Sequence, residues 1–357
     1  MYCEARSMPS RALVRPFSFL LAAALFGATA TVAADRSDGP HLKPGPTYHG
    51  MCDASASVAI DAERFVVAND EDNTLRIYHR DRPAEPLGEF DMTSHLDTEA
   101  KEPESDIEGA CWLDGRIYWI TSHGRNKKDK LRESRHRLFC TEVNGKGDEA
   151  TVVGVGKVYR DLLAAMIADG RYARYKLEAA SKLAPKKEGA LNIEGLAATP
   201  NGQLLVAMRN PIPGGRALIA PIENPKEIID EGADAKLGNP IELSLADGGR
   251  PLGIRSMEYD AGRKCYWIVG GHYDSGGRSV LFRWSGENLQ QPAVVKSVDF
   301  GKLGLNPESL FLYPGKSGAA GTIQILSDDG TKELDGKECK KADEASRRSF
   351  RTAFLVE

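Results

Sequence analysis

Four glutamates stand near the start of similar segments of the chain: Glu108, Glu194, Glu258 and Glu308. In each segment a short apolar stretch follows the glutamate, then a turn that contains glycine, then a second apolar stretch. Carboxylates that meet at one place raise one another's pKa, so such a group persists only where another interaction offsets the repulsion. We therefore interpret these four side chains as candidate ligands of a metal ion at a shared site.

Three kinds of interaction could offset the charge. A hard cation such as Ca²⁺ takes oxygen ligands and would use the carboxylates directly. Basic residues near the same segments, Arg125, Arg209 and Arg255, could pair with the carboxylates instead. Each glutamate could also hold the backbone of a neighbouring segment, which would be a structural role. The residue types leave these three alternatives open.

A second set of polar residues follows the second apolar stretch of each segment. If the two stretches are antiparallel strands, the second ends where the first begins, so these residues would lie beside the glutamates. His123 and His272 occupy equivalent places and are candidate catalytic bases. Arg209 suits an anionic group. The candidate substrate-binding residues are Arg209, Asn210, Asp274 and Asp328.

The segments are copies of an internal repeat. Their ranges are 106–124, 192–210, 255–272 and 306–329. A fifth copy, 53–73, has Ser55 where the others have glutamate. Successive copies lie roughly fifty residues or more apart, which is room for the four short strands of a propeller blade. Because the inner strands of a propeller line a central channel, the glutamates would converge there.

Further strands complete the predicted blades. The runs 75–80 and 279–286 suit third strands, and 87–92 suits a fourth. The final run, 350–357, would be the third strand of the last copy, and a strand near the N-terminus would complete that sheet and close the ring. We predict an all-β fold, a β-propeller with five detectable blades (six if one copy has diverged), with a helical insertion at about 157–184. A two-sheet sandwich is the structural alternative.

Residues 1–34 have the features of a signal peptide. Basic residues precede the apolar run 17–26, and small residues lead to a cleavage position after Ala34. The apolar run is too short to span a bilayer comfortably, so no membrane span is expected after cleavage. We therefore predict a single mature domain, 35–357, in the periplasm or outside the cell.

Composition narrows the classes of partner. The formal net charge is −4, without the clustered basic surface that nucleic acid requires. The sequence lacks the glycine-rich motifs of nucleotide cofactors, and we expect a monomer with a small-molecule ligand. Cys52 and Cys339 lie near the two ends of the mature domain and could pair in an oxidising compartment.

Several stretches carry a resemblance to a known family. DIEGACW, SHGRNK, PKKEGALNIEGL, RNPIPGGRALIAPI and PESLFLY are similar to the bacterial domain of unknown function 3616 family, over roughly residues 50–357. This resemblance implies no established activity. The strand that contains IEG also resembles, more distantly, esterase-like phytases and calcium-dependent lactonase propellers, which would imply metal-assisted hydrolysis at the channel mouth.

Two functional hypotheses follow. The first is a hydrolase that uses Ca²⁺ or a similar cation at the channel and acts on a small anionic ester or lactone. The second is a non-catalytic propeller that binds a small molecule, a glycan or a partner protein. The fold does not choose between them, because propellers serve many unrelated functions.

Overall fold

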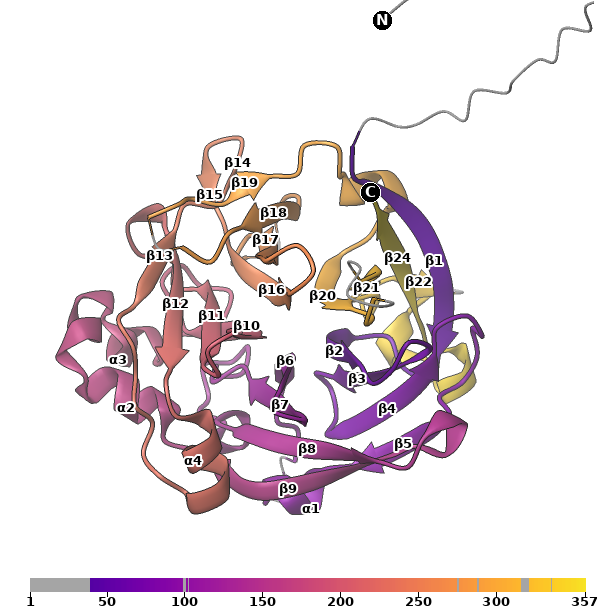
Figure 1. The fold of residues 1–357 in the computed structure, drawn as a ribbon, viewed down its shortest axis with the longest axis horizontal. Helices are drawn as coiled ribbons and strands as arrows, with labels where there is room; N and C mark the ends of the chain where they lie inside the picture. The colour runs from indigo at the N-terminus through magenta and orange to yellow at the C-terminus, as the bar shows by residue number, and fades with distance from the viewer. Residues whose placement is uncertain are drawn as a thin grey trace, which may run out of the picture. The chain divides into compact units, whose positions relative to one another are not determined.

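Antiparallel strands dominate the chain and form five four-stranded sheets around a common axis in its described part (Figure 1). The computed structural model describes residues 39–98, 101, 103–274, 276–287, 289–315, 321–334 and 336–357. The predicted signal peptide, residues 1–34, lies outside the described residues. The arrangement is a five-bladed β-propeller, as the internal repeat predicts.

The first strand of each repeat copy is the innermost strand of its blade. Blade 1 consists of β2 (Ala54–Ala59), β3 (Arg64–Asn69), β4 (Thr74–His79) and β5 (Gly88–Asp91). Blade 2 consists of β6 (Ile107–Leu113), β7 (Arg116–Thr121), β8 (Leu138–Asn144) and β9 (Thr151–Tyr159). Blade 3 consists of β10 (Asn192–Ala198), β11 (Leu204–Asn210), β12 (Ala217–Ile222) and β13 (Ile241–Leu243). Blade 4 consists of β16 (Gly253–Asp260), β17 (Cys265–Gly271), β18 (Val280–Trp284) and β19 (Ala293–Val294).

Blade 5 is assembled from both ends of the described chain. Its strands, from the axis outward, are β20 (Pro307–Leu312), β21 (Ile323–Ser327), β24 (Ser349–Val356) and β1 (His41–His49). β1 runs antiparallel to β24, with His41 opposite Val356 and His49 opposite Ser349. The prediction that an N-terminal strand closes the ring is therefore confirmed.

Helices and short hairpins occupy the connections between strands. The α-helices are α1 (Thr93–Leu96), α2 (Leu162–Ala168), α3 (Leu177–Ala180) and α4 (Pro225–Glu231). The 3₁₀ turns are η1 (Glu133–Arg135), η2 (Gly147–Glu149), η3 (Gly170–Tyr175), η4 (Pro213–Gly215), η5 (Phe300–Leu303), η7 (Cys339–Lys341) and η8 (Ala345–Arg347). The small hairpins are β14 (Ala246–Asp247) with β15 (Arg250–Pro251), and β22 (Glu333–Leu334) with β23 (Lys337–Glu338).

The helical insertion lies between blades 2 and 3 and begins later than predicted. β9 continues to Tyr159, which pairs with Leu138 of β8, so the first residues of the predicted range are strand. In the helical part, Leu162 and Met166 are fully buried and share one hydrophobic cluster with Leu196 of blade 3. The insertion therefore packs on the blades. Among the described residues we find no helix with the length and apolarity needed to cross a membrane.

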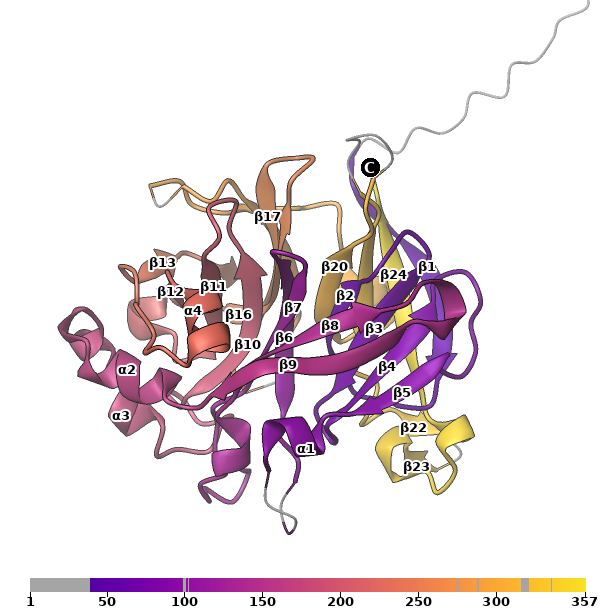
Figure 2. The same ribbon diagram turned by 60° about the horizontal axis from the view of Figure 1, so that its bottom comes forward.

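A lobe of residues 330–348 stands on the face of the propeller where the inner strands begin. It contains β22 and β23 and projects on the same side as α1 (Figure 2). A disulfide joins Cys339 in this lobe to Cys52, just before β2, across 287 residues of sequence. The Asp329 amide also donates a hydrogen bond to the Cys52 carbonyl, at 3.0 Å. The disulfide thus holds the lobe against blade 1, and the backbone bond fixes the residue that precedes the lobe.

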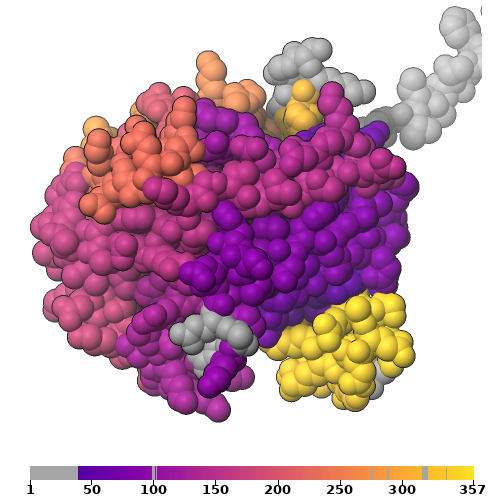
Figure 3. Space-filling view, turned by 90° about the horizontal axis from the view of Figure 1, so that it is seen from below, coloured from indigo at the N-terminus to yellow at the C-terminus, as the bar shows by residue number. Residues whose placement is uncertain are grey.

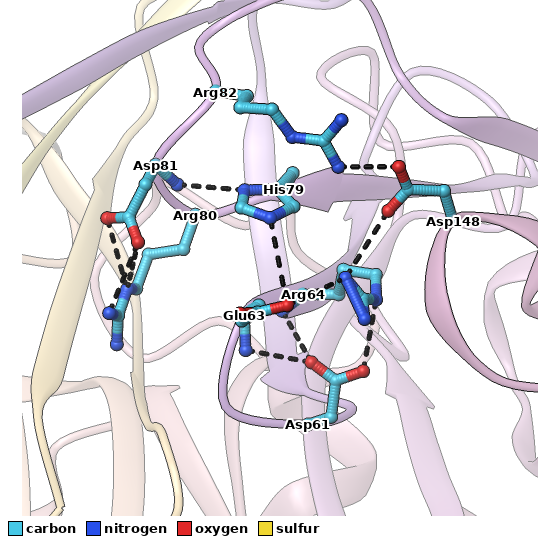
Figure 4. A network of polar contacts seen from close by, with 8 residues as sticks. All are labelled: Asp61, Glu63, Arg64, His79, Arg80, Asp81, Arg82 and Asp148. Atoms are coloured by element: carbon cyan, nitrogen blue, oxygen red, sulfur yellow. Dashed lines mark hydrogen bonds and ion pairs between the residues drawn. The ribbon is translucent and has the colours of Figure 1, made fainter.

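On the opposite face, a polar network joins blades 1 and 2 (Figure 4). Asp148, in the turn between β8 and β9, accepts from Arg64 at 3.3 Å and from Arg82 at 2.6 Å. Asp148 and Arg82 are exposed and Arg64 is half-buried, and an ion pair with an exposed partner contributes at most about 1 kcal/mol. The network therefore fixes the relative position of two turns without dominating stability.

The disulfide gives the first testable prediction. Replacing Cys52 and Cys339 together with alanine should lower the free energy of unfolding by about 2–5 kcal/mol, because the cross-link restricts the unfolded chain. Denaturant titration with and without a reducing agent measures the change. The reductant should lower the stability of the native protein to that of the double variant and leave the variant unaffected. Equal stability of both proteins under oxidising conditions would contradict the prediction.

Candidate functional site at the channel mouth

The five inner strands carry a β-bulge at the same place. The pairing register shifts after Ala54, Ile107, Ile193, Ile254 and Pro307. A bulge inserts one extra residue and redirects its side chain. The residues at these five positions are Ser55, Glu108, Glu194, Arg255 and Glu308.

This register corrects one of the predicted metal ligands. The sequence repeat aligns Glu258 with the other three glutamates, but the bulge of blade 4 places Arg255 at the equivalent position. Glu258 lies three residues further along β16, opposite Trp267, and is half-buried. Two residues separate Arg255 from Glu258 in this copy, where the other copies have one residue before the glutamate. The pairing register shows that Arg255 itself occupies the bulge.

Arg255 neutralises part of the carboxylate ring. Its guanidinium contacts Glu308, reaches Glu194 Oε2 at 3.5 Å, and donates to Asn306 at 2.6 Å. Arg209 donates to Glu194 Oε1 at 2.6 Å, and the side chains of Glu194, Arg209 and Arg255 are each 4% exposed. Burial alone would lower the pKa of Arg255, and the neighbouring carboxylates more than offset that effect. Of the three alternatives from the sequence, pairing with arginine describes Glu194 and Glu308.

Ser55, the copy without glutamate, holds its neighbouring blade. Its hydroxyl donates to the Ile107 carbonyl at 2.5 Å, where blade 2 begins. Ser57 and Ser309 bond at 2.6 Å between blades 1 and 5. These bonds are the structural role that the sequence analysis offered as its third alternative.

Glu108 lines a very small cavity between the inner strands. The cavity that it lines with Glu194 and Ser55 has a volume of only 10 Å³, which is space for about one water molecule. Burial, followed by repulsion from Glu194 and Asp106, raises the pKa of Glu108 well above its usual range. An organic substrate therefore does not fit beside the glutamates, and a substrate site must lie further out.

A cluster of carboxylates occupies the mouth of the channel. One carboxylate oxygen each from Asp53, Asp70 and Glu71 lies within 4.8 Å of the others, a spacing that could hold a metal ion. Asp70 Oδ1 is buried and has no hydrogen-bond partner among the described residues. Burial, and then repulsion from Asp53 and Asp106, raises the pKa of Asp70 well above its usual range. We call Asp53, Asp70 and Glu71 the acidic triad.

Asp328 and Lys340 complete the surroundings of the acidic triad. The backbone of Asp328 bridges to that of Asp53, and burial raises the pKa of each carboxyl to about 6. The Lys340 ammonium lies 2.6 Å from Glu71 and 3.9 Å from Asp53. Gly330 passes so close that an added Cβ would stand 1.7 Å from Asp53 Oδ1, so a larger residue there would displace the Asp53 carboxylate. The lobe therefore contacts the acidic triad directly, through Gly330 and Lys340.

The acidic triad borders a cavity with a basic rim. The cavity has a volume of 270 Å³, and Asp53 and Glu71 share its lining with four basic side chains: Lys127, Lys340, Lys341 and Arg348. Lys127 belongs to the long connection between β7 and β8, and the other three belong to the lobe. Figure 3 shows the yellow lobe and a purple-to-magenta projection on one side of the molecule, with a gap between them. We call the 270 Å³ cavity the mouth cavity.

The two predicted catalytic histidines lie apart from the described residues that line the mouth cavity. His123 is buried, its Nδ1 donates to the Thr121 carbonyl at 2.8 Å, and its ring centroid lies 5.2 Å from that of His136. Burial, and then His136, lowers the pKa of His123 to about 3. His272 is also buried, and its carbonyl accepts from Arg209 at 3.0 Å. Both Nε2 of His123 and Nδ1 of His272 lack partners among the described residues.

The remaining predicted residues have local partners. Asn210 donates to the carbonyls of Pro185 and Lys187, at 2.9 and 2.7 Å, and so anchors the loop before blade 3. Asp274 pairs with Arg250 at 2.6 Å at the rim of blade 4. Of the predicted substrate-binding residues, the structure brings only Asp328 to the acidic triad.

Sequence reasoning did not select the acidic triad or Lys340. Asp70 and Glu71 belong to a polar run at the end of β3 that is expected at the channel mouth, which was the available signal. Lys340 is brought there by the disulfide, since its neighbour Cys339 bonds to Cys52 beside Asp53.

A family model matches residues 132–328, more than half of the chain, and describes a protein of unknown function, DUF3616. The chain belongs to this family. The match spans from the end of the connection after β7 to Asp328 of blade 5, so this DUF3616 protein shares with its family blades 3 and 4 and parts of the two adjoining blades. Among curated proteins, none matches the chain.

Solved propeller structures resemble this DUF3616 protein at low identity. A glutaminyl cyclase from Myxococcus xanthus is 13% identical, with a TM-score of 0.46, over 89% of this chain and 98% of that one. A putative oxidoreductase (glucose dehydrogenase) from Thermus thermophilus is 11% identical, with a TM-score of 0.42, over 88% and 100%. An aldose sugar dehydrogenase from Streptomyces coelicolor, solved with PQQ, is 11% identical, with a TM-score of 0.40, over 88% and 98%. The activities in these names belong to those proteins.

The charge balance inside the channel gives the second prediction. Replacing Arg255 with methionine removes the cation that contacts Glu308 and should lower the free energy of unfolding by about 3–5 kcal/mol. Part of the loss should be recovered at acidic pH, because the carboxyl group can then be protonated. Denaturant unfolding at two pH values measures both effects. Arg278→Met, which breaks an exposed pair with Asp247, is the matched control and should cost at most about 1 kcal/mol.

Glu258 gives the third prediction. Burial raises its pKa to about 8, partly opposed by the Tyr259 amide. An acid whose pKa is higher in the folded state contributes its full stability below the unfolded pKa and loses it as the pH rises through the folded value. Glu258→Gln should therefore raise the melting temperature at pH 8 and change it little near pH 4. A lower melting temperature at pH 8 would contradict this account and favour a bound cation.

Proposed function

We propose that the mouth cavity binds a divalent cation, with Ca²⁺ the first candidate, together with a small anionic ligand such as a phosphate ester. The observation that carries the proposal is that two members of the acidic triad, Asp53 and Glu71, line one cavity together with four basic side chains. Carboxylates alone would suit a cation and basic residues alone would suit an anion. Their combination suits an anion that is held partly by a metal ion.

The triad fits a hard cation. Its donors are all carboxylate oxygens, the ligands that Ca²⁺ and Mg²⁺ prefer. Asp70 supplies a buried oxygen that no described residue satisfies, and an unsatisfied buried acceptor is costly. Lys340 already offsets part of the charge through Glu71, so a cation would have to bind beside it or displace it.

Hydrolysis of the bound ester is the reaction that we propose. A bound cation would supply Lewis-acid polarisation of the ester. Lys127, Lys341 and Arg348 line the cavity from two different loops and would orient the anionic group. Asp328, next to Asp53, is the carboxylate that would take a proton from an attacking water. This assignment moves the general base from the histidines to an acidic residue.

The Cys52–Cys339 disulfide supports a location in the periplasm or outside the cell, because disulfides persist in oxidising compartments. A binding site for Ca²⁺ would be consistent with the same location if free Ca²⁺ there is high enough to occupy the site.

A non-catalytic binding protein is the second candidate. The specific observation in its favour is Lys340, whose ammonium contacts Glu71 and lies near Asp53. In this arrangement the lysine would take the place of a metal ion, and the basic rim would bind an anionic ligand without chemistry.

The fourth prediction tests the cation. After treatment with EDTA, adding Ca²⁺ at a hundredfold excess over its Kd should stabilise the protein by about 2.7 kcal/mol. Asp70→Asn should abolish this shift. Asp148→Asn, which changes a carboxylate on the opposite face, is the matched control and should retain it. Thermal unfolding measures all three proteins.

The same variants separate the two candidates. A hydrolase should cleave p-nitrophenyl phosphate in the presence of Ca²⁺, lose that activity in Asp70→Asn and Asp328→Asn, and show a raised KM in Lys341→Ala. A shift with Ca²⁺ but no turnover of phosphate esters or lactones would support the binding protein. The absence of any Ca²⁺ or Mg²⁺ shift, also in Lys340→Met, would overturn the metal site.

A further inference from the structure

A second cavity lies on the face opposite the mouth cavity, between blades 3 and 4. Its volume is 420 Å³, which is within the range of small-molecule sites. It is bordered by the turn between β10 and β11 and by the connection between β12 and β13. From blade 4 it is bordered by residues at the facing ends of β16, β17 and β18. Because inner strands run from the mouth to this face, the two cavities lie at opposite ends of the blades.

An aromatic stack forms one wall of this second cavity. The rings of Tyr259 and Tyr266 have centroids 4.9 Å apart, and those of Tyr266 and Trp284 are 5.2 Å apart. Tyr266 and Trp284 are 3% and 1% exposed, whereas Tyr259 is half-buried, so Tyr259 is the ring that a ligand can reach. Gly286 has a φ of +87° and passes close to Tyr266, where a Cβ would stand 2.8 Å from the ring.

The rim of the second cavity is polar and carries no basic group. Three amides line it, from Asn201, Gln203 and Asn239, and each offers both donors and an acceptor. Glu223 and Glu287 add carboxylates, and no lysine, arginine or histidine is found among the described lining residues. An anionic ligand would meet two carboxylates without a counter-ion. The mouth cavity and this one therefore suit ligands of different charge.

We propose that this second cavity binds a neutral carbohydrate of roughly one or two sugar rings. Sugar hydroxyls donate and accept at once, which matches the amides and the carboxylates on the rim. The C–H face of a sugar ring is apolar and would pack on the exposed face of Tyr259. An organic cation could also use an aromatic ring beside carboxylates, but it would leave the three amides without a role.

Isothermal titration calorimetry with maltose, cellobiose and diacetylchitobiose, each at millimolar concentration, tests the proposal, with choline as the cationic comparison. At least one disaccharide should bind. Tyr259→Ala should weaken that binding roughly tenfold, and Tyr259→Phe should retain it. Glu287→Gln should change the affinity only a few-fold and leave it insensitive to salt, because an amide can still bond to a hydroxyl.

Three results would overturn the proposal: no binding of any of the three disaccharides, binding that Tyr259→Ala leaves unchanged, or binding of choline that Glu287→Gln abolishes. If Tyr259→Ala does not fold, the double variant Asn201→Ala and Asn239→Ala changes exposed residues only and should show the same loss. Asp70→Asn should bind the disaccharide like the native protein, so failure of the proposed metal site would leave this result intact.

Discussion

Buried charges on the inner strands must balance before the five blades can close around their axis. Each of the five inner strands has one bulged residue, and three of these residues, Ser55, Glu108 and Glu194, line a space with room for about one water molecule. Three of the bulged residues are glutamates. Arg255 and Arg209 pair with two of them, Glu194 and Glu308, whereas burial raises the pKa of the third, Glu108. Buried ion pairs therefore stabilise part of the glutamate ring, and the larger cavity lies further out, at the mouth.

The fold could be predicted from the sequence because the spacing of the repeat suits four-stranded blades. Apolar pairs of strands around glycine turns identified the inner strands, and the last strand and its N-terminal partner closed the ring as expected. The helical insertion lies where it was predicted, but its predicted start at about residue 157 was too early, because strand β9 continues to Tyr159.

The candidate site was predictable only in part. The glutamates do lie on inner strands, but the copy in blade 4 depends on a one-residue bulge, which no composition rule reveals, and so Glu258 was aligned where Arg255 lies. The position of Lys340 depends on a disulfide between residues 287 apart. A local sequence pattern does not reveal the position of a bulge or the partner of a distant cysteine, so it could not place Arg255 or Lys340. The polar run that contains Asp70 directly follows an apolar strand, so its place at the channel mouth could be predicted.

The pairing of β1 with β24 has a consequence for how the molecule is made. Blade 5 contains strands from both ends of the domain, so its outer half cannot form until nearly the whole polypeptide has been synthesised or translocated. Until then β1 has no partner strand, and an unpaired edge invites association with other chains. Contacts of such high sequence separation form slowly. Closure of the ring is thus a late event in folding. Oxidation of Cys52 and Cys339 would then link the two ends of the domain covalently.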